Sequence, residues 1–189
     1  MTKEELLDLI VSWENLPLLV RQLETEPKNL ELLMDLTFEN RHPKSWRAAY
    51  IADQINDNQP ELIAPFIPKM ILKLKKETSS SKKRHYLKLI SQHKFPQKHQ
   101  AFLVDYCLKC FTSASEPVAN RVHAMQVLFQ ISETEPGFKP ELLSIIEHEM
   151  ELHPTPGIVS RGKKLAKKLT EQTKKPGDFI YIQYPLRLQ

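Results

Sequence analysis

The chain has 189 residues, of which 41% are hydrophobic and 26% charged, and its formal net charge is +4. This is the composition of a folded globular protein, and the length suits one domain or a short array of repeats. Only four residues are glycine, and none precedes Gly137, which argues against many-stranded β folds and excludes glycine-rich phosphate loops and the nucleophile elbow from residues 1–136.

Apolar residues recur at helical spacing along almost the whole chain. In chain order the pattern predicts helices over residues 3–13, 16–25, 29–40, 43–55, 60–76, 80–92, 97–113, 117–132, 140–152 and 156–171. Thr2 and Glu5 have the spacing of a capping box at the first helix. Proline is tolerated in a first helical turn, and it stands at four of the predicted starts, Pro60, Pro117, Pro140 and Pro156. The sequence therefore predicts an all-α protein of about ten short helices.

Four arginines recur near the starts of predicted helices, Arg47, Arg84, Arg121 and Arg161, with successive separations of 37, 37 and 40 residues. An apolar helix precedes each of them, so that one period holds two helices. A period of this length with two helices in each unit indicates an α-solenoid.

The repeated phrases resemble HEAT and armadillo-like repeats over residues 29–171, most clearly at 121–128 and 140–169. The resemblance implies an α–α superhelix of about five helix pairs, in which the arginine begins the second helix and the second helices line the concave face. Carried over, the four arginines would point to one inner edge. The chain departs from the family pattern in lacking an Asp at a fixed distance before each arginine.

Two basic segments stand out from an otherwise acidic chain. Residues 73–88 and 161–175 each carry a net charge of +6, which leaves −8 for the remainder. Such segments are either solvated surface or contacts for an anionic partner. For the second interpretation the candidate partner- or phosphate-binding residues are Arg47, Lys82, Lys83, Arg84, Arg121, Arg161, Lys163, Lys164, Lys167 and Lys168.

No arrangement of catalytic or metal-binding residues is apparent. Cys107 and Cys110 lie in the middle of a predicted helix and have no second pair of ligands, so we expect packing thiols. His148 and His153 are five residues apart and point to different sides of a helix, whereas a zinc helix needs a spacing of four. We therefore expect no catalytic residue, metal or cofactor, and no enzyme activity.

The sequence is best interpreted as a non-enzymatic scaffold that binds a macromolecular partner, an acidic protein or protein segment, on the concave face. The alternative is a nucleic-acid-binding protein, because HEAT-like DNA-alkylation-repair proteins grip duplex DNA on a basic concave face. The repeated arginines and nearby lysines would then contact phosphates. A small-metabolite enzyme is a third alternative, with no residue pattern in its favour.

The end of the chain differs in composition from the rest. We expect residues 1–175 to form a single HEAT-like domain and residues 176–189 to form an extended apolar tail. The tail would cover the last repeat around Leu165 and Leu169, or the same face of a second molecule in a homodimer. No run of about 18 apolar residues exists, and residues 1–8 are too acidic for a signal peptide, so we expect a cytoplasmic protein without membrane contact.

Overall fold

The computed structural model describes residues 1–40 and 42–173, and in these residues the chain forms helices and no strand. The α-helices are α1 (Lys3–Ser12), α2 (Leu16–Thr25), α3 (Pro27–Phe38), α4 (Trp46–Asn58), α5 (Pro60–Ile63), α6 (Ile67–Leu74), α7 (Ser80–Ile90), α8 (Gln100–Thr112), α9 (Val118–Thr134), α10 (Lys139–Leu152) and α11 (Pro156–Thr173). Three 3₁₀-helices lie between them, η1 (Ala64–Phe66), η2 (Gln97–His99) and η3 (Pro136–Phe138).

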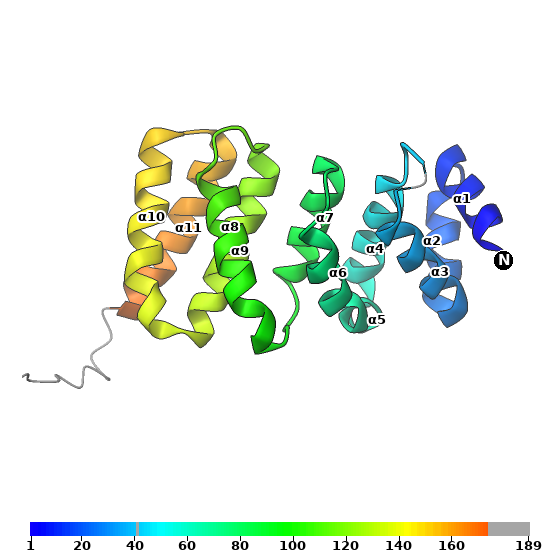
Figure 1. Ribbon diagram of the computed structural model, residues 1–189, viewed down its shortest axis with the longest axis horizontal. Coiled ribbons are helices and arrows are strands. Elements are labelled where there is room, and N and C mark those ends of the chain that lie inside the picture. The colour runs from blue at the N-terminus through cyan, green and yellow to red at the C-terminus, as the bar shows by residue number, and fades with distance from the viewer. Residues whose placement is uncertain (41, 174–189) are drawn as a thin grey trace, which may run out of the picture.

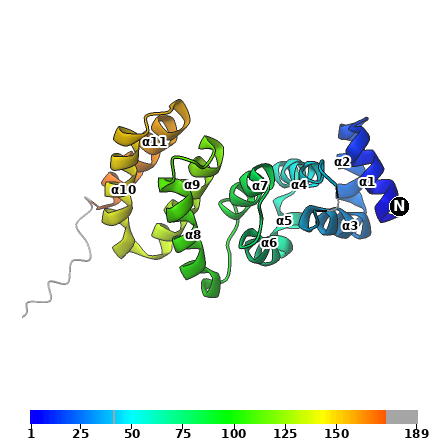
Figure 2. The same ribbon diagram turned by 45° about the horizontal axis from the view of Figure 1, so that its top comes forward.

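The helices stack as a linear array of antiparallel pairs (Figure 1). The first helices are α1, α3, α5 with α6, α8 and α10, and the second helices are α2, α4, α7, α9 and α11. Each second helix packs against the second helix of the next pair, from α2 on α4 through to α9 on α11. Figure 2 shows α1 and α2 at one end of the array and α10 and α11 at the other. The predicted all-α superhelix of about five pairs is confirmed.

The predicted helix starts are largely confirmed, and the capping box is present. Glu5 donates its backbone N–H to Thr2 Oγ1, and the Thr2 N–H donates to the Glu5 carboxylate. The segment 60–76 differs from the prediction, because it divides into α5, η1 and α6. Pro65 and Pro68 lack the N–H groups that a continuous helix would use there.

Every helix pair contributes apolar side chains to one continuous core. Gly162 of α11 illustrates how closely the helices approach, because a Cβ there would lie 2.6 Å from Met150 Sδ of α10. Leu165 and Leu169 are buried within this core. The prediction that the tail covers the last repeat around these two residues stays a prediction. The tail itself, and any dimer formed through it, lies outside the described residues.

Candidate binding surface

Arg47 of α4 stabilises the end of α1 rather than projecting from the array. Its guanidinium donates a hydrogen bond of 2.7 Å to the carbonyl oxygen of Val11 and lies 4.6 Å from the centre of the Trp13 ring. The last carbonyls of a helix have no partner within the helix. The arginine therefore caps α1 from the neighbouring pair.

Lys82 of α7 has the same role one pair further along. Its side chain is fully buried, and its ammonium donates to the backbone carbonyl of Glu39 and to Asn40 Oδ1, just after α3 ends. Burial lowers the pKa of Lys82, while the negative charges of Glu77 and Glu39 act in the opposite direction. This buried ammonium is held in place by the end of α3.

Arg121 of α9 caps α8 and also forms a buried ion pair. Its Nε donates to the Phe111 carbonyl at 2.8 Å, and its Nη2 lies 2.7 Å from the Glu149 carboxylate of α10. The same Glu149 oxygen is 3.0 Å from His153 Nδ1. Arg121 thus joins three helices in the interior.

These contacts correct one of the sequence-based expectations. Lys82 and Arg121 are buried and engaged within the protein, so we remove them from the candidate partner-binding residues. Arg47 and Arg121 both turn to the carbonyl ends of first helices, and the prediction that the four arginines share one edge stays a prediction. In the third pair the equivalent cation is Lys82, and Arg84, two residues later, is exposed.

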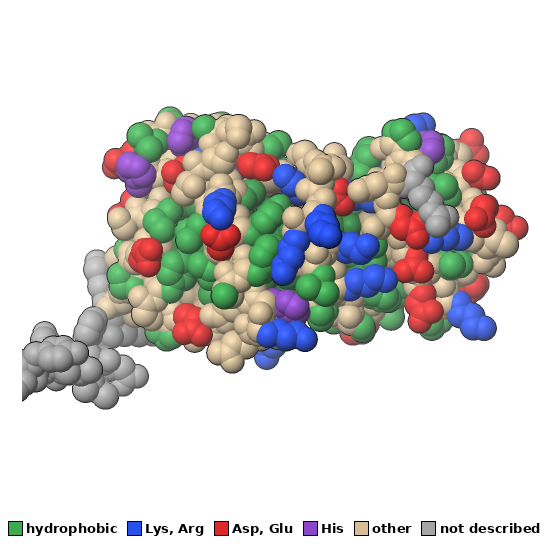
Figure 3. All heavy atoms as spheres, viewed as in Figure 1, with side chains coloured by type: hydrophobic (Ala, Val, Ile, Leu, Met, Phe, Trp, Pro, Cys, Tyr) green, Lys and Arg blue, Asp and Glu red, His purple; other side chains and the backbone are tan. Residues whose placement is uncertain are grey.

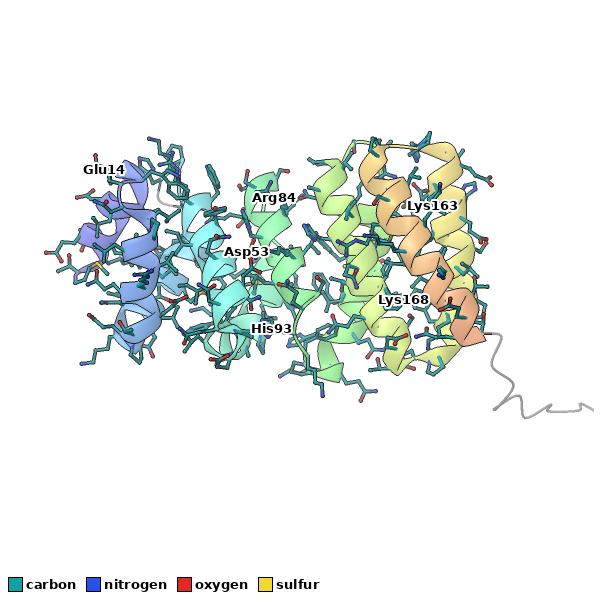
Figure 4. The ribbon with its side chains drawn as sticks, turned by 180° about the vertical axis from the view of Figure 1, so that it is seen from behind. Glu14, Asp53, Arg84, His93, Lys163 and Lys168 are labelled. Carbon is teal, nitrogen blue, oxygen red and sulfur yellow. The ribbon has the colours of Figure 1, made fainter. Side chains whose placement is uncertain are left out.

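Arg84 belongs to a polar network on the side of the array formed by the second helices. His85 Nδ1 lies 3.1 Å from the Asp53 carboxylate of α4, and Arg84 Nη2 lies 3.2 Å from His85 Nε2 (Figure 4). Because a guanidinium can only donate, Nε2 accepts and Nδ1 carries the proton that is donated to Asp53. The structure therefore assigns a neutral His85 in a single tautomer.

Lys88 completes the network, with its ammonium 2.7 Å from Asp53 and 3.3 Å from Asp57. Burial alone would raise the pKa of Asp53, but the hydrogen bonds from His85 and Lys88 and the positive charge of Lys88 outweigh burial and lower it. Asp53 is therefore a buried carboxylate whose charge is neutralised inside the protein.

His123 of α9 lies next to this network, on the same side of the array. Its ring is half-buried, and burial together with the nearby Arg161 lowers its pKa to about 4. Lys88 and Arg84 act in the same direction, and only Asp53 opposes them. The imidazole is therefore neutral at neutral pH, amid positive charge.

A groove of about 570 Å³ runs between α9 and α11. Its lining residues are Gln126, Arg161, Lys164, Leu165, Lys167, Lys168 and Glu171. We call this the α9–α11 groove. Arg161 donates to the Gln126 side chain across it, and the Lys168 ammonium lies 5.7 Å from the Phe129 ring. Lys163, on the same helix, is exposed but is not among the lining residues; Figure 4 labels it with Lys168.

The basic segment 73–88 does not form one surface. Lys83 pairs with Glu116 at 3.2 Å, and the Lys75 ammonium lies 4.7 Å from the Phe102 ring of α8, a first helix. Figure 3 shows Lys and Arg side chains also gathered near the middle of the side formed by the first helices. Arg84 and Lys88 are thus the members of this segment that contact the Asp53 network.

The remaining candidate groups pack in the interior. Cys107 and Cys110 are buried free thiols, and burial raises the pKa of both, that of Cys110 to about 12. This confirms them as packing thiols, because nucleophilic cysteines have a lowered pKa. Within residues 1–40 and 42–173, no three His, Cys, Asp or Glu side chains are grouped to hold a metal ion.

The sequence patterns predicted no binding role for Gln126, for His123 or for the Asp53 network. These residues carry no repeated motif, and only the stacking of α4, α7, α9 and α11 brings them together. The spacing of apolar residues could have placed His123 and Gln126 on one face of α9, since they are three residues apart.

A family model described as HEAT repeat domain matches residues 3–169. The chain belongs to the HEAT repeat family. The match extends from the start of α1 almost to the end of α11, so all five helix pairs of this HEAT repeat protein are covered. Searches of curated proteins and of solved structures gave no match. None of the described helices is both long and apolar enough to cross a membrane.

Proposed function

We propose that this HEAT repeat protein is a non-enzymatic scaffold whose second helices bind an acidic segment of a partner protein. The observation that carries the proposal is the α9–α11 groove, which is lined by four cationic side chains and a single acidic one. HEAT repeats are helical scaffolds that commonly mediate protein interactions. The charge of the groove favours an acidic partner.

Most cationic side chains of the groove form no ion pair. Within the part of the chain that the structure describes, no carboxylate lies within ion-pair distance of Arg161, Lys164 or Lys168. Lys167 is 3.9 Å from Glu171 of the same helix, and both are exposed. An exposed pair of this kind contributes little stability, so it does not prevent a partner carboxylate from binding.

The spacing of these residues also suits an elongated partner. Arg161, Lys164 and Lys168 follow the i, i+3, i+7 pattern of one helix face, which extends for about 10 Å along α11 at 1.5 Å per residue. Arg84 on α7 extends the positive charge toward the middle of the array. A partner segment with carboxylates along one side would contact both the cations of the α9–α11 groove and the positive charge on α7.

The test is the affinity of a synthetic helical peptide with Glu along one face, measured by calorimetry at low and moderate salt. The Lys164→Glu, Lys168→Glu double variant should bind roughly tenfold more weakly or worse, because two attractions of up to about 1 kcal/mol become repulsions. Lys163→Glu is the control, with the reversal of one charge on the same helix outside the groove. Equal losses in the double variant and the control would contradict the proposal.

Nucleic-acid binding is the alternative, since the same cations can contact phosphates. Lys75 and Lys83 contact Phe102 and Glu116, whereas Arg84 and Lys88 contact the Asp53 network. The cations of segment 73–88 therefore do not form one continuous row that could follow the phosphates of a nucleic acid. A duplex titration at two salt concentrations separates the alternatives. Affinity for duplex DNA that exceeds the affinity for the acidic peptide and falls steeply with salt would favour nucleic acid.

A further inference from the structure

The centre of the side formed by the second helices holds two guanidinium groups without an acidic partner. Arg84 of α7 contacts the neutral ring of His85, and Arg161 of α11 donates to the neutral amide of Gln126. Among residues 1–40 and 42–173, no carboxylate pairs with either guanidinium. Arg121, in contrast, is buried against Glu149. Arg84 and Arg161 thus carry positive charges that no carboxylate of the neighbouring helices compensates.

His123 lies on α9, which packs between α7 and α11, and it stands one turn before Gln126, to which Arg161 donates. Both arginines and Lys88 act electrostatically on its ring. No described side chain or backbone group hydrogen-bonds its ring. The acidic group that faces it is Asp53, which is already engaged by His85 and Lys88. The ring nitrogens therefore remain available beside an excess of positive charge.

We propose that Arg84, His123 and Arg161 form a subsite for a phosphoryl group, carried by a phosphorylated serine or threonine of the acidic partner segment. This inference rests on the proposed function. The guanidinium fork matches the oxygen atoms of a phosphate. A phosphorylated side chain carries about −1.5 to −2 charges at neutral pH, which balances two guanidinium groups better than one carboxylate does.

A dianion bound at this subsite should raise the pKa of His123. An anion beside the ring favours its protonated form, and an opposite charge at this range raises a histidine pKa by about 1 or more. The other charges that face the ring are Arg84 and Lys88 from α7, Arg161 from α11 and Asp53 from α4. Their effects are present with and without the anion, so the change in pKa reports the anion alone.

The first experiment follows the ring signals of His123 by NMR in the full chain, with inorganic sulfate at constant ionic strength. Sulfate is a suitable probe because its charge stays constant where His123 titrates. We expect the pKa of His123 to rise from about 4 when sulfate is added, and to remain unchanged in the Arg84→Gln, Arg161→Gln double variant. An unchanged pKa in the wild-type protein would overturn the subsite.

The second experiment compares an acidic peptide with its form phosphorylated at one central serine. The wild-type protein and the Lys163→Gln control should bind the phosphorylated form roughly tenfold more tightly, which is about 1.4 kcal/mol for the added charge-assisted hydrogen bonds. The Arg84→Gln, Arg161→Gln variant should lose this preference. Both arginines lie outside the core, and a thermal melt verifies that the variant folds.

The outcomes separate the subsite from the proposed function. Binding of both peptides with equal affinity overturns the phosphoryl subsite and leaves the acidic-segment scaffold intact. Failure of both peptides to bind overturns the scaffold as well. Duplex DNA that binds more tightly than the phosphopeptide, and loses affinity in the arginine variant, overturns the proposal in favour of nucleic acid.

Discussion

The guanidinium of Arg121 and the carboxylate of Glu149 lie 2.7 Å apart between α9 and α10, and the side chains are only 3% and 5% exposed. Removing one partner of such a pair leaves the other charge buried and uncompensated. We expect Glu149→Leu to lower the free energy of unfolding by about 3–5 kcal/mol. Urea denaturation measures it.

The control for this prediction is Asp105→Ala, which removes an exposed ion pair with Lys109, one turn away on α8. That pair should contribute at most about 0.5 kcal/mol. Equal losses of stability in the two variants would show that Arg121 and Glu149 do not form a structural pair.

Lys82 should matter more for stability than its neighbour Lys83. In Lys82→Met the carbonyl of Glu39 and the side chain of Asn40 lose a buried donor, at a cost of about 1–3 kcal/mol. Lys83→Met removes the partly exposed pair with Glu116, at a cost of about 1 kcal/mol or less. Thermal and urea unfolding of the two variants measure the difference, and the reverse order would contradict the capping role of Lys82.

Asp53 should make stability depend on pH in the acid range. Its pKa in the folded protein lies below the ordinary value of an aspartate side chain, so its contribution is present above that ordinary value and is lost as the pH falls through the folded pKa. Asp53→Asn should therefore cost about 1–3 kcal/mol at neutral pH and progressively less below about pH 4. A difference from the wild-type protein that stays constant across this range would contradict the assignment.

Gly162 should tolerate a methyl group only if Met150 gives way. Gly162→Ala gains about 1 kcal/mol of helix propensity, but its Cβ would lie 2.6 Å from Met150 Sδ, and overpacking costs about 1–3 kcal/mol. We expect a net loss of stability that becomes a gain in a Met150→Ala background. Gly137→Ala is the control, because nothing lies within 4 Å of its Cβ. A loss that persists without Met150 would contradict the contact.

The sequence predicted the helices and their pairing because both depend on local signals. Apolar spacing marks the buried face of each helix, and prolines such as Pro117 and Pro156 mark the starts. The same local signals could not show that Lys82 takes the place of an arginine in the third pair, because the repeat is recognisable in the sequence only by its arginines. The capping role is defined by the carbonyl group that the cation reaches on another helix.

The binding surface was predictable only in part. Lys164 and Lys168 could be placed on one helix face from their spacing, and the groove confirms that they line one wall together. The contribution of Gln126, and the effect of Arg84 and Arg161 on His123, depend on contacts between helices of different pairs. Such contacts follow from the stacking of the repeats, which no short motif records.

We propose that an acidic partner binds the second helices over α7, α9 and α11. The most direct measurement maps the amide chemical shifts of the labelled protein during titration with the Glu-rich helical peptide. We predict that the perturbed residues cluster around Arg84, Gln126 and Lys164. Perturbations that cluster instead on the first helices α6 and α8, around Lys75 and Phe102, would contradict the account.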